Sequence, residues 1–365
     1  MTAERIDRAR EVMRERDLDA VLISNPHSRR YLTGYTGDDH PPDESAGILL
    51  ILRNRATLFA SPNNVDWARS EAPHVEVSGW GYPWTTTVAD AIREAGAASI
   101  GFEEEALSVG EFQRLTEATG EAVTWTPLAG VIERLRVIKD ESEIAILAEA
   151  CRITDAAFAA GESALKPGMT ELELVAILND AMRSNGGDGP GFSTIVAAGP
   201  HAARPHHAPG DRKIEPGEPV IIDIGAEYHG YRADLTRTIC AGTPTPELIS
   251  VYNLVLAAQE AALSAIRSGA AGKAVDDVAR ACFREAGHGD HFIHGLGHGV
   301  GLRIHEAPSA GPRSNDILAS GMTLTVEPGL YIPGWGGVRI EDFVVVESDG
   351  FRNLSAAPKR LTINR

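Results

Sequence analysis

The sequence is poor in cysteine and has no long apolar run. Its three cysteines, Cys151, Cys240 and Cys282, are odd in number and far apart, which favours neither a disulfide framework nor a thiolate metal site. No stretch reaches the roughly 18 consecutive apolar residues that a membrane span requires. The charged amino terminus, "MTAERIDRAREVMRERDLDA", also lacks the apolar core of a secretory signal. We therefore expect a cytoplasmic protein that does not enter a membrane.

Basic residues are scarce relative to acidic ones. The chain has 34 lysines and arginines against 51 aspartates and glutamates, so its formal net charge is −17. Phosphate neutralisation needs clustered lysine and arginine, and this charge therefore argues against a nucleic-acid partner. The 43% of hydrophobic and 23% of charged residues are typical of a soluble globular protein. With 365 residues, the chain is long enough for two domains.

Strand and helix patterns alternate in the first part of the chain. Apolar runs predict strands at "DAVLIS", on both sides of Arg53 and Asn54 in "GILLILRNRATLFA", and at "HVEVSGW" and "SIGFEE". Helical patterns cover residues 85–95 and 108–118. The alternation predicts a small α/β domain over residues 1–127. Its stretch "SNPHSRRYLTGYTG" is interpreted as a loop, either facing a ligand or simply lying on the surface.

A connector that begins with Pro and Gly residues, at 128–140, leads into a second domain predicted over residues 141–365. This domain opens with a long helix, and further helices are expected at residues 170–184, 246–268 and 274–286. Strand patterns occur in "EPVIIDIG", "DLTRTI", "MTLTVEPGLYI" and "VRIEDFVVVE". We expect an α+β domain in which helices flank the residues borne on a sheet.

Two expected hairpins each carry two acidic residues. Asp223 and Asp234 stand in "VIIDIGAEYHGYRADL" with ten residues between them, a spacing that we expect to set them directly opposite one another on one face. Glu327 and Glu341 likewise flank the turn of "TVEPGLYIPGWGGVRIED". Because an unpaired buried carboxylate is costly, four convergent acids predict bound cations.

A simpler alternative pairs each acid with a nearby arginine at a strand end. The arginines available for such pairs are Arg232, Arg237 and Arg339. This explanation suits one acid better than four, since each acid has apolar or β-branched neighbours.

The stretch "HGLGHGVGLRIHE" supplies imidazoles on a glycine-rich backbone. His294 and His298 have the spacing of a helical zinc pair, but the four glycines here argue against a helix and predict a bulged strand or loop. The glycine spacing also differs from that of a dinucleotide-binding loop. One imidazole with four carboxylates suits two hard or borderline divalent ions, Mn²⁺ or Co²⁺ before a thiolate-type Zn²⁺ site.

Taken together, these motifs closely resemble the metallopeptidases of the pita-bread fold, which include methionine aminopeptidases, Xaa-Pro aminopeptidases and prolidases. The resemblance spans nearly the whole chain and depends on "VIIDIG", "ADLTRT", "GLGHGVGL", "TVEPGLYI" and "GVRIED". It implies a creatinase-like α/β N-terminal domain before an α+β pita-bread catalytic domain. It also implies a centre of two divalent ions, Mn²⁺ first and Co²⁺ or Zn²⁺ as alternatives, with five ligands: Asp223, Asp234, His298, Glu327 and Glu341.

The resemblance further implies catalytic or substrate-binding roles for residues near these ligands: His206, His294, His305, Arg339 and Tyr231. His206 of "RPHHAP" would shape the proline side of the pocket, with His207 as the second choice. His294 and His305 would hydrogen-bond the scissile carbonyl as it gains negative charge.

The implied reaction is hydrolysis of the bond between an N-terminal residue and a following proline, by a hydroxide that bridges the two metals. Glu327 would accept the proton of the attacking water and pass it on. The first domain favours the Xaa-Pro group over methionine aminopeptidases, and the complete ligand set argues against creatinase. Ser309 stands in "HEAPSAG" where some prolidases carry arginine, so we expect an Xaa-Pro aminopeptidase before an Xaa-Pro dipeptidase.

Two alternatives from other classes stay open. One is a metal-dependent hydrolase or lyase of a small non-peptide substrate, because a fold does not fix its substrate. The other is a catalytically silent peptide-binding module, although such relatives usually lose ligands. The resemblance also implies a homodimer, in which the first domain of one chain borders the active site of the other.

Overall fold

The computed structural model describes residues 2–37, 39 and 44–362. The chain divides between Arg136 and Val137 into two compact units. Throughout the described part of the chain, every helix is too short or too polar to cross a bilayer.

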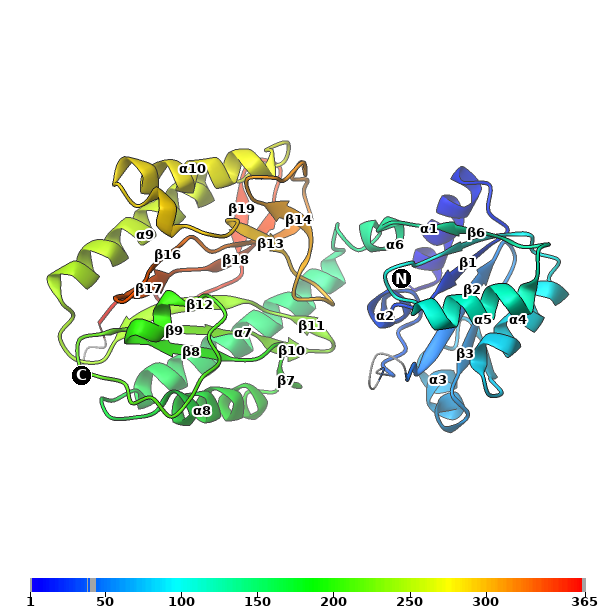
Figure 1. The fold of residues 1–365 in the computed structure, drawn as a ribbon, viewed down its shortest axis with the longest axis horizontal. Coiled ribbons are helices and arrows are strands. Elements are labelled where there is room, and N and C mark those ends of the chain that lie inside the picture. The colour runs from blue at the N-terminus through cyan, green and yellow to red at the C-terminus, as the bar shows by residue number, and fades with distance from the viewer. Residues whose placement is uncertain (1, 38, 40–43, 363–365) are drawn as a thin grey trace. The chain divides into compact units, whose positions relative to one another are not determined.

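The first unit is a six-stranded mixed sheet with helices packed against it (Figure 1). In sheet order its strands are β4 (Glu76–Gly79), β3 (Ala56–Ala60), β2 (Gly47–Leu52), β1 (Ala20–Ile23), β5 (Ser99–Phe102) and β6 (Thr124–Pro127). Its helices are α1 (Thr2–Glu15), α2 (Pro26–Thr33), α3 (Val65–Glu71), α4 (Trp84–Glu94), α5 (Val109–Thr119) and α6 (Val131–Arg134), with a 3₁₀ turn η1 (Pro62–Asn64). The α/β architecture predicted for this part of the chain is confirmed.

The two central strands are apolar throughout because both faces of the sheet are covered. Leu22 and Leu50 form one core with Val88 and Ile92 of α4. Helix α1 contacts both of these strands as well, and α2 contacts β2. Every residue of β1 and β2 is therefore buried, as the continuous apolar runs require.

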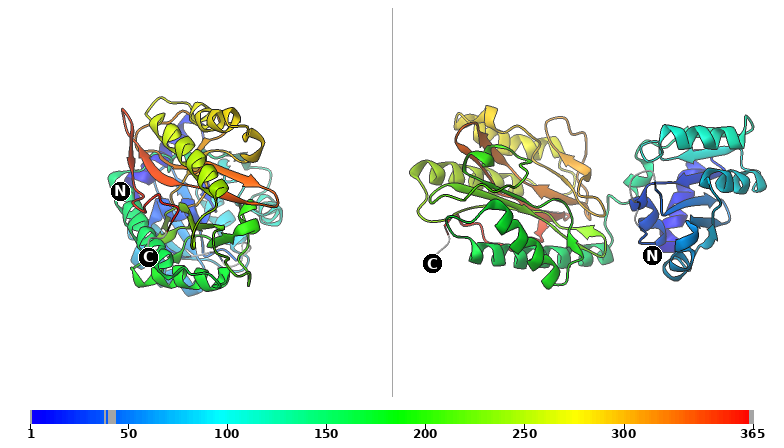
Figure 2. Two further views of the ribbon diagram at one scale, coloured as in Figure 1. Left: turned by 90° about the vertical axis from the view of Figure 1, so that its left-hand side faces the viewer. Right: turned by 60° about the horizontal axis from the view of Figure 1, so that its bottom comes forward.

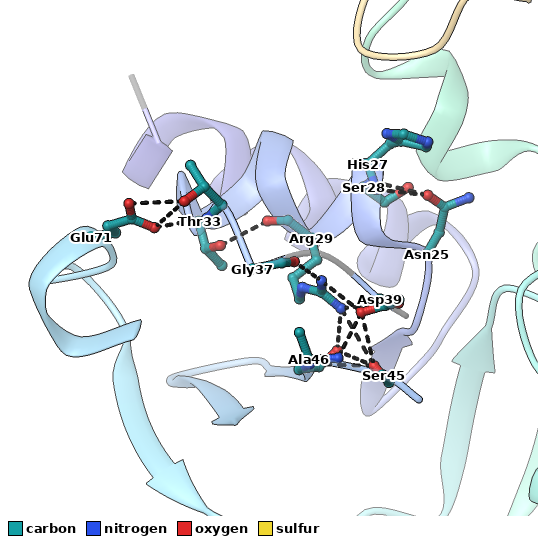
Figure 3. A network of polar contacts seen from close by, with 12 residues as sticks. Asn25, His27, Ser28, Arg29, Thr33, Gly37, Asp39, Ser45, Ala46 and Glu71 are labelled. Atoms are coloured by element: carbon teal, nitrogen blue, oxygen red, sulfur yellow. Dashed lines mark hydrogen bonds and ion pairs between the residues drawn. The ribbon is translucent and has the colours of Figure 1, made fainter. Parts of the chain in front are cut away.

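Most of the stretch expected to be a loop, "SNPHSRRYLTGYTG", is a helix, so that interpretation was wrong. Asn25 caps α2 with its side chain, Pro26 occupies the first turn, and Gly34 ends the helix with a φ of 79°. These are ordinary helix start and stop signals. Figure 3 shows how the fully buried Arg29 then fastens the following segment, donating to the Gly37 and Gly47 carbonyls and pairing with Asp39 at 3.0 Å.

The second unit contains four long helices and a set of short sheets (Figure 1). The helices are α7 (Glu141–Ala164), α8 (Glu171–Ser184), α9 (Pro246–Ser264) and α10 (Gly272–Glu285), with 3₁₀ turns η2 (Gly199–Ala203) and η3 (Gly289–His291). The strands of its first half are β7 (Gly189–Pro190), β8 (Ile195–Ala198), β9 (Pro219–Ile224), β10 (Ala226–Tyr228), β11 (Tyr231–Arg232) and β12 (Leu235–Cys240). Those of its second half are β13 (Gly297–Gly299), β14 (Glu306–Ala310), β15 (Thr323–Val326), β16 (Gly329–Ile332), β17 (Gly336–Arg339), β18 (Asp342–Val346) and β19 (Phe351–Asn353).

Two separate helix-covered cores build this unit. Helices α7 and α8 bury one face of the sheet β12-β9-β8, while α9 and α10 cover strands β15 to β18. Figure 2 shows the two helix pairs on opposite sides of the strands. Capping boxes at Asp140 and Thr170 start α7 and α8, since each cap side chain and its partner glutamate satisfy backbone donors. The inner strands are left to face each other between the two cores.

Turn length sets the register of the first acidic hairpin and corrects the expected pairing. His229 and Gly230 form a tight turn with φ values of 49° and 78°, so Tyr228 pairs with Tyr231 and Asp223 faces Thr236. Asp234 therefore lies two residues before the partner of Asp223, diagonal to it rather than directly opposite. A shift of two residues keeps both carboxylates on one face.

Candidate active site

A cavity of about 530 Å³ lies in the second unit, where the strands of the two helix-covered cores face each other. Its ionisable lining comprises the acids Asp223, Asp234, Glu327 and Glu341, the histidines His206, His207, His294, His298 and His305, and Arg339. Of the residues to which the sequence assigned a ligand, catalytic or substrate-binding role, all but Tyr231 are among those lining this cavity. Segments more than 100 residues apart thus converge on one space.

Each ligand candidate sits on or just beyond a short strand. Asp223 belongs to β9, and His298 to β13, where a bulge interrupts the ladder between His298 and Gly299, as the glycine-rich pattern predicts. A Cβ at Gly297 would overlap the Thr325 carbonyl oxygen. Glycine therefore lets β13 approach β15 closely enough for the imidazole of His298 to reach the acids.

The acids and the imidazole lie within reach of a common ion. Oxygen atoms of Asp223, Asp234 and Glu341 lie within 4.8 Å of one another. Nε2 of His298 is 3.3 Å from Glu327 Oε1 and 3.7 Å from Asp234 Oδ2. The spacing is that of side chains grouped around a point rather than paired one to one.

Burial and mutual repulsion make this arrangement costly without a cation. Burial, followed by the charges of Glu341, Asp223 and Glu327, raises the pKa of Asp234 well above its usual value. Burial, followed by the charges of Glu327 and Asp223, likewise raises the pKa of Glu341 well above its usual value. Among the described residues, Asp223 Oδ1 and Glu341 Oε1 are buried without any hydrogen-bond partner. These unsatisfied oxygens fit a divalent cation, which prefers such ligands.

Only one of the four acids follows the arginine-pairing alternative. Arg339 forms a close ion pair with Asp223, leaving the other oxygen of that carboxylate unpaired. Arg232 pairs with Glu227 instead, and Arg237 with Asp342. The alternative is therefore wrong for three of the acids.

Glu327 is the most acidic group of the cavity. Burial raises its pKa, but the hydrogen bond and charge of His298, with His294 and Arg339, outweigh burial and lower the pKa of Glu327 to about 2. Thr325 Oγ1 also donates to Glu327 Oε1 at 3.2 Å. Glu327 is thus an anion at neutral pH and an acceptor for protons or cations.

His294 is held between a carbonyl and a tyrosine that the sequence reasoning missed. Its Nδ1 lies 2.7 Å from the Gly295 oxygen, which can only accept, so Nδ1 carries a proton. Burial lowers the pKa of His294, and in the neutral ring Nε2 accepts from the Tyr331 hydroxyl at 2.9 Å. Arg339 donates to the same hydroxyl at 2.9 Å. Tyr331 lies in the motif "TVEPGLYI", four residues after Glu327, and that spacing was its signal in the sequence.

A second missed pair fixes the backbone around His294. Arg280 of α10 donates to the His294 and Phe292 carbonyls at 2.7 and 3.0 Å. The fully buried Asp276 binds Arg280 through two hydrogen bonds and accepts from the Leu296 amide at 3.0 Å. The spacing of four residues between Asp276 and Arg280 was the available signal for this pair.

The remaining histidines and Tyr231 differ in their surroundings. His305 lines the cavity from an exposed position, and burial of part of its ring, with the charge of His298, lowers its pKa. His206 lines the cavity, whereas His207 turns its Nε2 to Glu171 at 2.9 Å. The Tyr231 hydroxyl donates to Glu143 of α7 at 2.8 Å, so the structure does not bring it to the cavity.

Comparison with known proteins agrees with this geometry. Residues 145–348 match the model of metallopeptidase family M24, and residues 5–138 match the creatinase/prolidase N-terminal domain. An Xaa-Pro dipeptidase of Pyrococcus furiosus is 34% identical over 98% of this chain and 99% of its own. The chain therefore belongs to metallopeptidase family M24.

Solved structures share the fold along the whole chain. An Xaa-Pro dipeptidase from Bacillus anthracis superposes with a TM-score of 0.94 at 39% identity, covering 99% of both chains. An X-Pro aminopeptidase from Thermotoga maritima superposes with a TM-score of 0.87 at 35% identity, covering 95% of this chain and 97% of its own. The predicted α+β architecture, a creatinase-like unit before a pita-bread catalytic unit, is confirmed. Family membership also implies divalent metal ions at the site.

Proposed function

We propose that this metallopeptidase is an Xaa-Pro dipeptidase that works with two divalent ions in the cavity. The observation that carries the proposal is the convergence of four acids and His298 with too few cations to balance them. The ligands proposed are Asp223, Asp234, His298, Glu327 and Glu341. Two ions would balance four carboxylates, and Mn²⁺ is the ion proposed first for an oxygen-rich set, before Co²⁺ or Zn²⁺.

A dipeptide substrate replaces the expectation of an aminopeptidase. That expectation depended on Ser309, whose amide and hydroxyl are bound to Asp316 at 2.8 and 3.0 Å. Ser309 is not among the residues that line the cavity, so its identity is no argument against a dipeptide. The relatives from Pyrococcus furiosus and Bacillus anthracis carry the dipeptidase name. The aminopeptidase from Thermotoga maritima keeps the longer substrate as the second candidate.

Bound divalent ions would supply Lewis acidity, polarising the scissile carbonyl and making water nucleophilic near neutral pH. Glu327, anionic and inside the cavity, accepts the proton of the attacking water and delivers it to the departing proline nitrogen. His305 stabilises the carbonyl oxygen as charge develops on it. Arg339 keeps Tyr331 and Asp223 in place through one guanidinium group.

His294 acts differently from the expected carbonyl donor. Its Nε2 accepts a hydrogen bond from the Tyr331 hydroxyl. This nitrogen can therefore donate to a substrate only when the hydroxyl moves away and the ring changes tautomer, or when the ring is protonated. His206, on the cavity wall, shapes the side that receives proline. A cavity of about 530 Å³ lies within the range of about 300–1,000 Å³ that small ligands occupy.

A peptide panel tests the proposal. Protein supplied with Mn²⁺ is given an Xaa-Pro dipeptide, the matching Xaa-Pro tripeptide, and both peptides with alanine in place of proline. We expect the highest kcat/KM for the Xaa-Pro dipeptide. Preference for the tripeptide would identify an aminopeptidase, and hydrolysis of neither proline peptide would overturn the proposal in favour of a small-molecule hydrolase or lyase, or of a silent binding module.

A further inference from the structure

Beside the cavity, two histidines converge on one buried glutamate. Glu171 begins α8, His201 lies in η2, and His207 follows in the next loop. Nδ1 of His201 lies 2.9 Å from Glu171 Oε1, and Nε2 of His207 lies 2.9 Å from Glu171 Oε2. The two rings face each other with centroids 4.2 Å apart. One atom from each of the three side chains lies within 4.8 Å of the others.

Backbone amides hold the Glu171 carboxylate in place. The Ala198 and Gly210 amides donate to the two oxygens of Glu171 at 3.0 Å each. The Glu171 side chain is 0% exposed, that of His207 7% and that of His201 28%. Within the described part of the chain, no lysine or arginine forms an ion pair with Glu171. A buried, oriented carboxylate whose side-chain partners here are two imidazoles, with one atom of each within 4.8 Å of the others, is a suitable ligand for a cation.

The donor set differs in kind from that of the catalytic cavity. There, one imidazole joins four carboxylates, a set for hard ions; here, two imidazoles join one carboxylate. Two histidines and a glutamate make up a three-ligand zinc set, with the fourth position free for water. The partial exposure of His201 leaves one side of the cluster open to solvent.

We propose that Glu171, His201 and His207 form a metal site separate from the catalytic centre, suited to Zn²⁺ or a similar borderline ion. To bind the ion, the ring nitrogen of each histidine that lies against Glu171 must be free of its proton, which is released to the other ring nitrogen or to solvent as the metal takes its place. Because His207 also lines the cavity, the bound ion would form part of the cavity wall.

Zinc binding to the intact protein tests the site. Zn²⁺ is titrated into the wild type and into a His201→Gln/His207→Gln variant, in which each amide still donates to Glu171. We expect the variant to bind about one Zn²⁺ ion per chain fewer than the wild type. His288→Gln/His291→Gln is the matched control, since these rings also meet, with their Nδ1 atoms 3.2 Å apart. The control should keep the wild-type zinc count, and equal counts in all three proteins would overturn the proposal.

A second measurement needs no histidine variant. Crystals soaked in Zn²⁺ should show an anomalous zinc peak about 2.0–2.2 Å from the three ligand atoms. An Asp223→Asn/Glu341→Gln variant should lose zinc from the cavity and keep this peak, so failure of the catalytic centre is distinguishable from failure of this site. A hydrogen-bonded cluster with no zinc density between the three side chains would refute the site.

Discussion

Two kinds of buried acid occur in this protein, and adjacent residues show both. Asp342 pairs with Arg237 at 2.9 Å and with Lys359 at 2.6 Å; these cations outweigh burial and lower the pKa of Asp342. Among the described residues, the Glu341 carboxylate accepts a hydrogen bond only from the Thr236 hydroxyl, at 2.8 Å, and burial raises its pKa well above the usual value. Successive side chains of a strand point to opposite faces, so one acid serves the framework and the next faces the cavity.

The same contrast holds across the second unit. Framework acids have their cations at hand: Arg280 binds Asp276, and Lys139 binds Glu306 at 2.7 Å. The residues that line the cavity include four carboxylates but one arginine, Arg339, which forms its ion pair with Asp223. The lack of a paired cation beside a buried carboxylate therefore distinguishes the site from the framework better than the number of acidic residues does.

The largest effect is expected for Glu327→Gln, which removes the proton acceptor of the cavity. We expect kcat to fall by about 10²–10⁴-fold, the usual contribution of general acid–base catalysis. Metal content must be measured beside kcat, because Glu327 is also a proposed ligand. Glu347→Gln is the control, since its side chain is 53% exposed at a surface ion pair. Near-normal turnover by a metal-loaded Glu327→Gln protein would remove Glu327 from the mechanism.

Neighbouring substitutions should change stability in opposite directions. In the presence of a chelator, Asp342→Asn should lower the free energy of unfolding by about 3–5 kcal/mol, because it leaves Arg237 and Lys359 without the carboxylate that pairs with them. Glu341→Gln should raise it, because it removes a repelled charge whose pKa is raised in the folded protein. Urea unfolding of both variants measures the difference. A loss of stability in both would show that the cavity acids are framework residues too.

Glu103, in the first unit, is a buried acid with a raised pKa, like Asp234 and Glu341 of the cavity. Its carboxylate accepts from the Ser24 and Asn25 amides at 2.8 Å, yet burial prevails and raises the pKa of Glu103 to about 7. The folded state then binds the proton more tightly than the unfolded state. Its contribution to stability is complete below pH 4.5 and is lost as the pH rises to about 7, a change of about 3 kcal/mol.

Tryptophan fluorescence can follow this change, since four of the five tryptophans, Trp67, Trp80, Trp84 and Trp125, lie in the first unit. Unfolding of that unit should need less urea at pH 7 than at pH 4.5. Glu103→Gln should flatten the dependence. An unchanged slope in that variant would assign the pH effect to other groups.

The smallest effect is expected for Arg280→Met, which frees the backbone on both sides of His294. We expect kcat to fall about tenfold, less than the roughly 10²-fold that a 1 Å misplacement can cost. Arg280→Lys should restore part of the loss, and Arg284→Met, an exposed change on the same helix, should have no effect. Equal losses of activity and folded protein in Arg280→Met would indicate a structural role alone.

Much of this was readable from the sequence because the signals are local. Capping boxes at Asp140 and Thr170 mark helix starts, and the short motifs around Asp223, His298 and Glu327 carry the resemblance to the family. The misreading of α2 was avoidable, since Asn25, Pro26 and Gly34 are local signals as well. The register of the Asp223 hairpin was not, because it depends on which residues form the turn.

By itself, then, the sequence determined the helices and strands, the family and the residues offered for the site, since each depends on neighbours along the chain. Only the tertiary structure decided which acid meets an arginine and which does not, that Tyr331 rather than Tyr231 contacts His294 of the cavity, and that Glu171 meets two histidines. Those outcomes depend on contacts between distant segments. Such contacts arise when the two helix-covered cores pack, and no short stretch of sequence records them.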